Sequence, residues 1–92
     1  MDAKHLQALL NTATSKQGDD GWWELPEGHS LTLYGGRAGV SIAVSKVTGL
    51  KQDGDLVSLR TAKGDTYVVV LADMFAGSVE GTFTSARKAG FL

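Results

Sequence analysis

The sequence predicts a mainly β protein, a small antiparallel barrel or roll that follows one short amphipathic helix. Three observations predict this fold class. Several short runs alternate apolar with polar residues, which is the pattern of half-buried strands. Gly54 and Gly64 each stand in a polar turn signal between two such runs, which is typical of a meander of hairpins. Residues 3–16, by contrast, place their apolar side chains at helical spacing.

The length of 92 residues predicts a single domain, 1–92. We expect the helix within 2–17, the β-barrel or meander within 22–83, and a tail or short helix within 84–92. A chain of this size buries only roughly 60 to 65% of its unfolded surface. Its stability therefore depends on good packing or on association between subunits.

The composition restricts the function classes. A formal net charge of −1 provides no general attraction for nucleic acid, so this partner is disfavoured. The lack of cysteine excludes disulfides, thiolate metal sites and cysteine nucleophiles. The first residues do not have the features of a signal peptide, and no apolar run reaches the roughly 18 residues of a membrane span. We therefore expect a cytoplasmic protein that does not enter a membrane.

The predicted helix begins at Asp2, a good N-cap residue, and ends before Gly18. Its apolar stripe consists of Ala3, Leu6, Leu9, Leu10 and Ala13. An isolated helix shorter than about 12 to 15 residues is marginal in water. We therefore expect the stripe to pack against the β region of the same chain or of a neighbouring copy.

The first β runs precede the meander. Residues 22–25 predict a short strand that ends at Pro26. The alternating runs 30–34 and 40–44 then predict a hairpin that is closed by a glycine-rich loop, 35–39.

The apolar phase slips by one residue after Val44, because the next apolar residue in the pattern is Val47 and not residue 46. Such a slip turns every later side chain to the other face of the sheet unless a bulge absorbs it. The sequence therefore predicts a bulge or bend near Ser45 and Lys46.

The two glycine turns predict the register of the meander. If both are three-residue loops with glycine in the left-handed position, Lys51 pairs with Asp55, and Thr61 pairs with Asp65. This register gives one consistent core face, made of Val47, Gly49, Val57, Leu59, Tyr67 and Val69. A two-residue loop at 63–64 also keeps apolar neighbours together, but Lys-Gly fits such a turn poorly.

The opposite face of the meander mixes apolar and polar side chains. In this register it carries Leu50, Leu56, Val70, Thr48, Ser58, Val68, Lys46, Arg60 and Thr66. Lys46 and Arg60 lie opposite each other, and like charges in that position destabilise a sheet. A face of this composition is neither clearly buried nor clearly solvated, so it is a candidate surface for a partner.

The chain continues with a single helical turn, predicted over 72–77, and a last short strand, predicted over 78–83. The order of short strands, a bend, tight hairpins and a helical turn resembles the small β-barrels of the SH3-like and Sm-like classes over residues 30–83. A PH-like roll with a capping helix from Ala72 onward is the competing topology. The peptide-binding loop of SH3 domains and the RNA-binding loops of Sm proteins are not visible, so these ligands are not carried over.

No residue pattern of an enzyme is evident, and we expect neither catalysis nor a cofactor. His29 could bind a metal together with Glu24 or Glu27, but a solvated turn histidine is the simpler interpretation. The serine and threonine residues lack the sequence context of an activated nucleophile. We therefore expect no metal site and no catalytic residue.

Trp22 and Trp23 are adjacent, so their side chains point to opposite faces if they lie in a strand. One ring can then enter the core while the other needs cover from the helix or from a partner. The alternative is that both rings pack under the helix. An exposed tryptophan can anchor an interface or stack on a ligand.

These features predict a small non-enzymatic binding or assembly module that forms a homo-oligomer or docks on a protein partner. Its candidate partner-binding residues are Trp22, Trp23, Leu50, Leu56, Val68 and Val70. The alternative is a domain that binds an anionic ligand or nucleic acid through a tryptophan platform and three cations, Arg37, Lys46 and Arg60. Arg37 lies in the loop 35–39, which could form a backbone nest for an anion.

Overall fold

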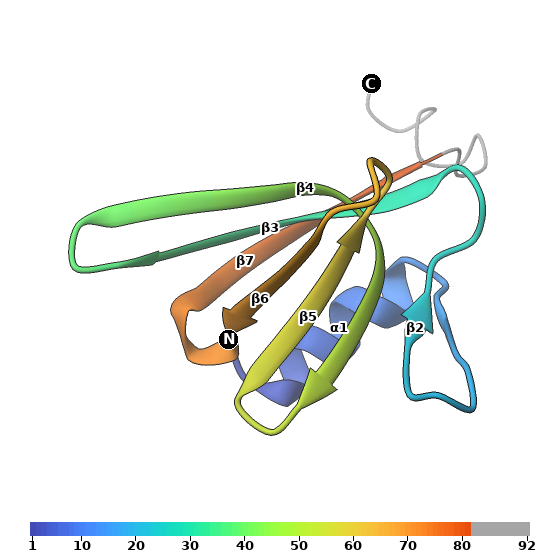
Figure 1. Ribbon diagram of the computed structural model, residues 1–92, viewed down its shortest axis with the longest axis horizontal. Helices are drawn as coiled ribbons and strands as arrows, with labels where there is room; N and C mark the ends of the chain where they lie inside the picture. The colour runs from blue at the N-terminus through green and yellow to red at the C-terminus, as the bar shows by residue number, and fades with distance from the viewer. Residues whose placement is uncertain (82–92) are drawn as a thin grey trace.

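The computed structural model describes residues 1–81 and confirms a mainly β fold with one α-helix (Figure 1). The sheet is antiparallel and curls into a half-barrel. The elements are α1 (Ala3–Thr12), β1 (Lys16–Gln17), β2 (Trp23–Glu24), β3 (His29–Arg37), β4 (Val40–Asp53), β5 (Leu56–Thr61), β6 (Thr66–Val70), the 3-10 turn η1 (Leu71–Asp73) and β7 (Met74–Gly81). The tail predicted over 84–92 and the end of the strand predicted over 78–83 lie outside the described residues.

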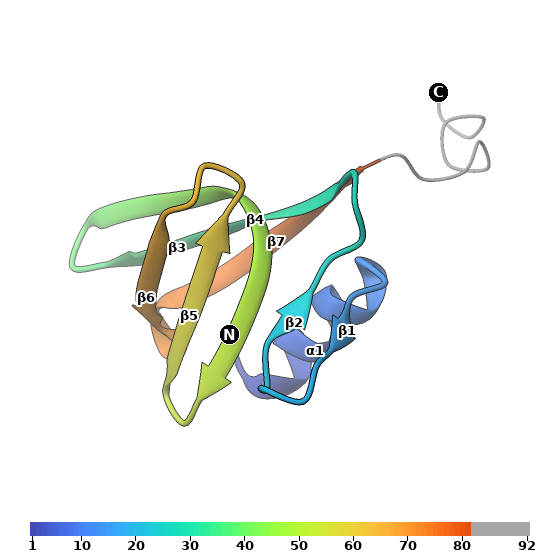
Figure 2. The ribbon, with the colours of Figure 1, turned by 45° about the vertical axis from the view of Figure 1, so that its right-hand side comes forward.

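Strand β4 is the long central strand of the sheet. It pairs with β3 along its first half and with β5 along its second half, while β7 returns to pair with β3. Strand β6 continues the sheet beyond β5. The short strands β1 and β2 form a hairpin beside α1, and the tip of the β3–β4 hairpin projects away from the rest of the domain (Figure 2).

The predicted bulge in β4 is confirmed. Leu33 pairs with Val44, but Leu31 pairs with Val47, so Ser45 and Lys46 together oppose a single residue of β3. Lys46 has a φ of 60°, in the left-handed region that side chains other than glycine rarely adopt. The bulge bends β4 at the point where it leaves β3 and joins β5.

Helix α1 begins at the predicted cap, because the Asp2 carboxylate accepts a hydrogen bond of 2.8 Å from the backbone N–H of His5. The predicted extent, 2–17, is too long, because α1 ends at Thr12. Thr14 turns the chain in the left-handed conformation, and the N–H of Ser15 donates to the Leu10 carbonyl, which closes the helix end. The following residues pair with β2 instead, so tertiary pairing overrides the helical pattern.

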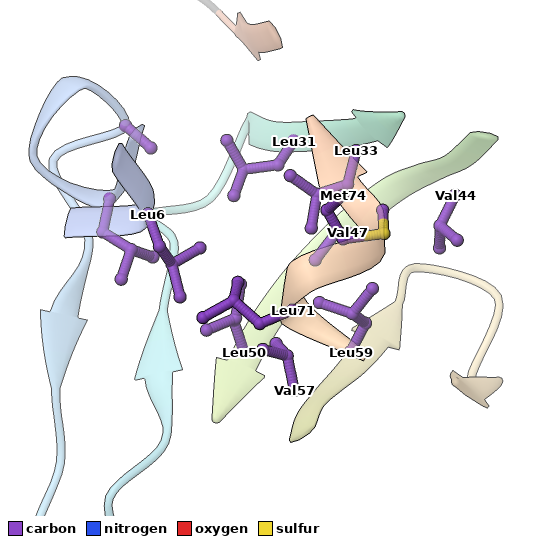
Figure 3. Packing of buried hydrophobic residues seen from close by; sticks show 12 residues of the cluster. Leu6, Leu31, Leu33, Val44, Val47, Leu50, Val57, Leu59, Leu71 and Met74 are labelled. Carbon is purple, nitrogen blue, oxygen red and sulfur yellow. The ribbon is translucent and has the colours of Figure 1, made fainter. Parts of the chain in front are cut away.

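The core lies between α1 and the concave side of the sheet (Figure 3). Its buried apolar residues are Leu6, Leu10, Ala13, Leu31, Leu33, Val44, Val47, Leu50, Val57, Leu59, Leu71 and Met74. The helix approaches β7 closely at Gly77, where an added Cβ would lie 2.7 Å from Cδ1 of Leu9. A residue larger than glycine at this position would therefore push the helix away from the sheet.

The second hairpin of the meander has the predicted register, since Thr61 N–H donates to the Asp65 carbonyl and Leu59 pairs with Tyr67. The predicted register of the first hairpin is wrong. Its turn has only two central residues, because Asp53 pairs with Leu56. Gly54, with a φ of 61°, fits the first position of such a turn as well as it would fit a bulge.

This difference in the first turn moves Leu50 to the core. Leu50 pairs with Leu59 and is 0% exposed, so its predicted place on the outer face is wrong. The prediction that Lys46 faces Arg60 is wrong for the same reason, because Arg60 pairs with Gly49. Lys46 and Arg60 are therefore not cross-strand partners, and the predicted repulsion between them does not arise from strand pairing.

Two other local predictions are also wrong. The loop predicted over 35–39 is a two-residue turn, Ala38–Gly39, because β3 continues to Arg37. The two turn residues have φ values of 53° and 83°, which are typical of a tight hairpin turn. The helical turn predicted over 72–77 is restricted to η1, and β7 begins at Met74.

Candidate interaction surface

The outer face of the meander β4–β5–β6 carries the candidate surface. Along β5, the inward side chains of Val57 and Leu59 are buried, so the intervening residues point outward. The outward cross-strand pairs are Leu56 with Val70, Ser58 with Val68, and Arg60 with Thr66. Val68 is 62% exposed and Leu56 is 46% exposed, so this face holds an uncovered apolar patch.

A tryptophan and an arginine extend this patch toward β2. The guanidinium carbon of Arg60 lies 3.8 Å from the centroid of the Trp22 ring, a cation–π contact. Both side chains lie beside Gly49, where an added Cβ would lie 3.6 Å from the Cβ of Arg60 and 3.7 Å from Cε3 of Trp22. These are ordinary contact distances, so the stacked pair lies over β4 without crowding it.

Local hydrogen bonds hold Trp22 in place. Its backbone N–H donates to the Asp20 carboxylate at 3.0 Å, and its carbonyl accepts from the Gly18 N–H at 2.9 Å. The neighbouring Trp23 pairs with Leu50 and packs against the core. Of the two arrangements that the sequence leaves open, the structure has the one in which the rings separate: Trp23 packs against the core, and the Trp22 ring stacks on Arg60.

We use the name outer surface for the side chains of Trp22, Arg60, Leu56, Ser58, Val68 and Val70. Its combination of apolar, aromatic and arginine side chains is typical of protein interfaces. Tryptophan and arginine are the residues that most often dominate binding energy at protein interfaces. An exposed cation–π pair contributes only about 0.5 to 1 kcal/mol by itself. The contact also restricts both side chains, and a side chain that is already ordered loses less entropy when it is buried in a further contact.

The edge of the sheet adds to this surface. Within residues 1–81, β6 pairs with β5 on one side and with no strand on the other. An unpaired edge presents free N–H and C=O groups that another strand can bind. The edge lies directly beside Val68 and Val70 of the outer surface.

The three cations of the predicted anion site each contact different neighbours in the structure. Arg37 forms an ion pair with Asp73, with 3.0 Å between Nε and Oδ2. Lys46 lines a pocket at the bulge, and Arg60 stacks on Trp22. The predicted backbone nest around Arg37 would require the loop that the tight turn replaces.

His29 joins β3 to the end of α1. Its Nδ1 lies 3.1 Å from the Ala13 carbonyl oxygen and 3.4 Å from Oγ1 of Thr14. In the part of the chain that the structure describes, no group of three or more His, Asp or Glu side chains is arranged to hold a metal ion. The described helices likewise contain none that is long and apolar enough to cross a membrane.

Sequence reasoning missed two features of the site. The contact between Trp22 and Arg60 joins residues far apart in the chain, and no local signal points to it. The pocket at the β4 bulge was indicated in part, because the phase slip near Lys46 marks the bulge but not the turn residues that complete the pocket.

Comparison of the chain with family models, with curated proteins and with solved structures finds no match.

Proposed function

We propose that this protein is a small non-enzymatic assembly module that self-associates through the outer surface of its meander. The observation that carries the proposal is the continuity of that surface. An exposed apolar patch, a preformed Trp22–Arg60 pair and the edge of β6, which no strand within residues 1–81 pairs, lie side by side on one face. A second copy of the chain is the simplest partner, because a twofold axis near β6 would bring the same patch and edge of both copies together.

The size of the domain supports association. A chain of 92 residues has a small core, and burial of Leu56 and Val68 between two copies would add to the apolar surface removed from water. Docking on a different protein through the same surface is the other form of the proposal. In that case the isolated protein stays monomeric, and the outer surface binds the partner instead.

The strand order supports a closer likeness to SH3-like and Sm-like barrels than to a PH-like roll. A 3-10 turn separates β6 from β7, and β7 is a strand that returns to β3 rather than a capping helix. This likeness concerns the arrangement of the strands, and we do not transfer a ligand from either class. The lack of cysteine is consistent with a cytoplasmic location.

Sedimentation velocity over a range from low to high micromolar concentration tests the proposal. We expect the wild-type chain to gain mass with concentration and Val68→Asp to remain monomeric, because the substitution places a charge in the apolar patch. Val40→Asp is the matched control, since Val40 is 66% exposed but lies at the tip of the β3–β4 hairpin. A wild-type chain that stays monomeric at high micromolar concentration would exclude self-association.

The alternative function, binding of nucleic acid or another anionic ligand by Arg37, Lys46 and Arg60 together, receives less support. The ion pair with Asp73 occupies Arg37, and Arg60 lies on the outer face beside Trp22. Titration with an oligonucleotide, monitored by tryptophan fluorescence, tests it. A salt-sensitive change that is lost in Arg60→Ala would favour this function over assembly.

A further inference from the structure

The bulge in β4 and the turn between β5 and β6 enclose a pocket of about 310 Å³ on a different part of the molecule from the outer surface. Its lining residues are Ala43, Val44, Ser45, Lys46, Thr61, Lys63, Asp65 and Tyr67. The volume is near the lower limit of the range from about 300 to 1,000 Å³ that is usual for small-molecule sites. A ligand with one ring and one charged group is of the right size.

The backbone around Lys46 is strained in a way that positions this lysine. A left-handed conformation costs a residue with a side chain roughly 1 to 2 kcal/mol, and glycine would avoid that cost. The strain is maintained by the neighbouring turn, because the Lys46 carbonyl accepts a hydrogen bond of 2.9 Å from the N–H of Ala62. A strained residue held by its surroundings is a reason to look for a functional role.

The turn that carries Lys63 is also well fixed. The N–H of Thr61 donates to the Asp65 carbonyl at 2.9 Å, and the N–H of Gly64 donates to the Thr61 carbonyl at 2.9 Å. The bulge in β4 and the turn between β5 and β6 thus bring Lys46 and Lys63 to one pocket. Among residues 1–81, neither lysine forms an ion pair, so both charges are available to a ligand.

The remaining groups of the pocket define the chemistry further. Tyr67 is 46% exposed, and its ring can stack on a planar ligand. The hydroxyl of Ser45 can donate a hydrogen bond to an oxyanion, and the carboxylate of Asp65 can accept one from a ligand hydroxyl or amine. Two ammonium groups and one carboxylate leave a net positive charge at the pocket.

We propose that this pocket binds a phosphate monoester attached to a planar ring, a ligand with the chemistry of a nucleoside monophosphate. Lysine is a common phosphate ligand and acts as a point charge. Lys46 and Lys63 contact the phosphate, Tyr67 stacks on the ring, and Asp65 accepts from the polar groups of the ligand. The charged groups of the site come from the β4 bulge and the turn between β5 and β6, outside the outer surface, so binding does not require self-association.

Titration of ¹⁵N-labelled protein with adenosine monophosphate, adenosine and inorganic phosphate, followed by NMR, tests the proposal. We expect the monophosphate to bind most tightly and to shift the amide signals of residues 43–46 and 61–67. Lys63→Gln and Lys46→Gln should each weaken its binding by about fivefold to tenfold, because each removes a charged contact to the phosphate. Lys51→Gln is the matched control, since Lys51 lies beside Gly21 and away from the pocket.

Three results would overturn the proposal. If adenosine binds as tightly as the monophosphate, the lysines do not recognise phosphate. If inorganic phosphate binds as tightly as the monophosphate, Tyr67 makes no contact with the ring. If the amide signals of the pocket do not move at millimolar monophosphate, the pocket is not a site for this ligand. Circular dichroism of each variant establishes that a loss of binding does not come from unfolding.

Discussion

The two faces of the meander β4–β5–β6 contain similar residues but differ in what covers them. On the inner face, Leu50, Val57 and Leu59 are buried under α1 and the neighbouring strands. On the outer face, Leu56 and Val68 are exposed, and the Trp22–Arg60 pair lies over the adjacent part of the sheet. Apolar character alone therefore does not decide burial here, because the register of the strands and the position of the helix assign each side chain to a face.

The largest expected difference between the two faces comes from truncating one leucine on each. Leu50→Ala should lower the free energy of unfolding by about 3 kcal/mol, since it leaves a cavity in the core. Leu56→Ala should lower it by less than about 1 kcal/mol, because Leu56 is already half exposed. Urea denaturation of both variants, at a concentration where the protein is monomeric, measures the difference. Equal losses would contradict the observed register, in which only Leu50 belongs to the core.

The next largest difference in stability is expected between alanine substitutions at two glycines, Gly35 and Gly49. An added Cβ at Gly35 would lie 2.6 Å from Sδ of Met74 and 2.7 Å from the Asp73 carbonyl oxygen, a backbone atom that cannot easily move. At Gly49, on the outer face, the nearest atoms lie at an ordinary contact distance of 3.6 Å. We expect Gly35→Ala to destabilise the protein by about 1 to 3 kcal/mol. Gly49→Ala should change stability little, and thermal unfolding of the two variants would show whether the contact of β3 with Met74 is as tight as described.

A substitution at the end of α1 should raise the stability of the protein, unlike the substitutions above, which lower it. Thr14→Gly should stabilise the protein by about 1 kcal/mol, because glycine adopts the left-handed conformation without the steric cost that threonine has. A more stable C-terminal end of α1 should keep the helix packed more firmly over the inner face of the sheet. Chemical denaturation measures the gain, and a loss of stability would indicate that the contact of Thr14 with His29 matters more than the backbone strain.

The smallest expected effect concerns the outer face alone. In a double-mutant cycle of Trp22→Ala and Arg60→Ala, we expect a coupling free energy of about 0.5 to 1 kcal/mol in the monomer. The two single variants should each reduce self-association more strongly than they reduce stability. A coupling energy of zero would mean that the stacked pair is not preformed before association.

The sequence predicts those features of the fold that depend on a short segment of the chain, and it does not predict contacts between distant segments. The bulge at Lys46 follows from the apolar phase, and the register at Gly64 follows from the fit of glycine to a three-residue turn. Gly54 fits both turn types, so the residues alone do not decide its register, and the three-residue turn predicts the wrong face for Leu50. The contact of Trp22 with Arg60 depends on how β2 docks on β4, which no short segment specifies.

Hydrogen exchange of the β6 amides as a function of protein concentration tests self-association through the outer surface most directly. We expect residues 66–70 to become more protected as the concentration rises, because a second copy covers the edge of β6. The tip of the β3–β4 hairpin, residues 38–42, should exchange at the same rate at every concentration. The contrary result is an exchange rate of β6 that stays constant while the mass of the protein increases with concentration. The copies would then associate through another surface, and self-association through the outer surface would be excluded.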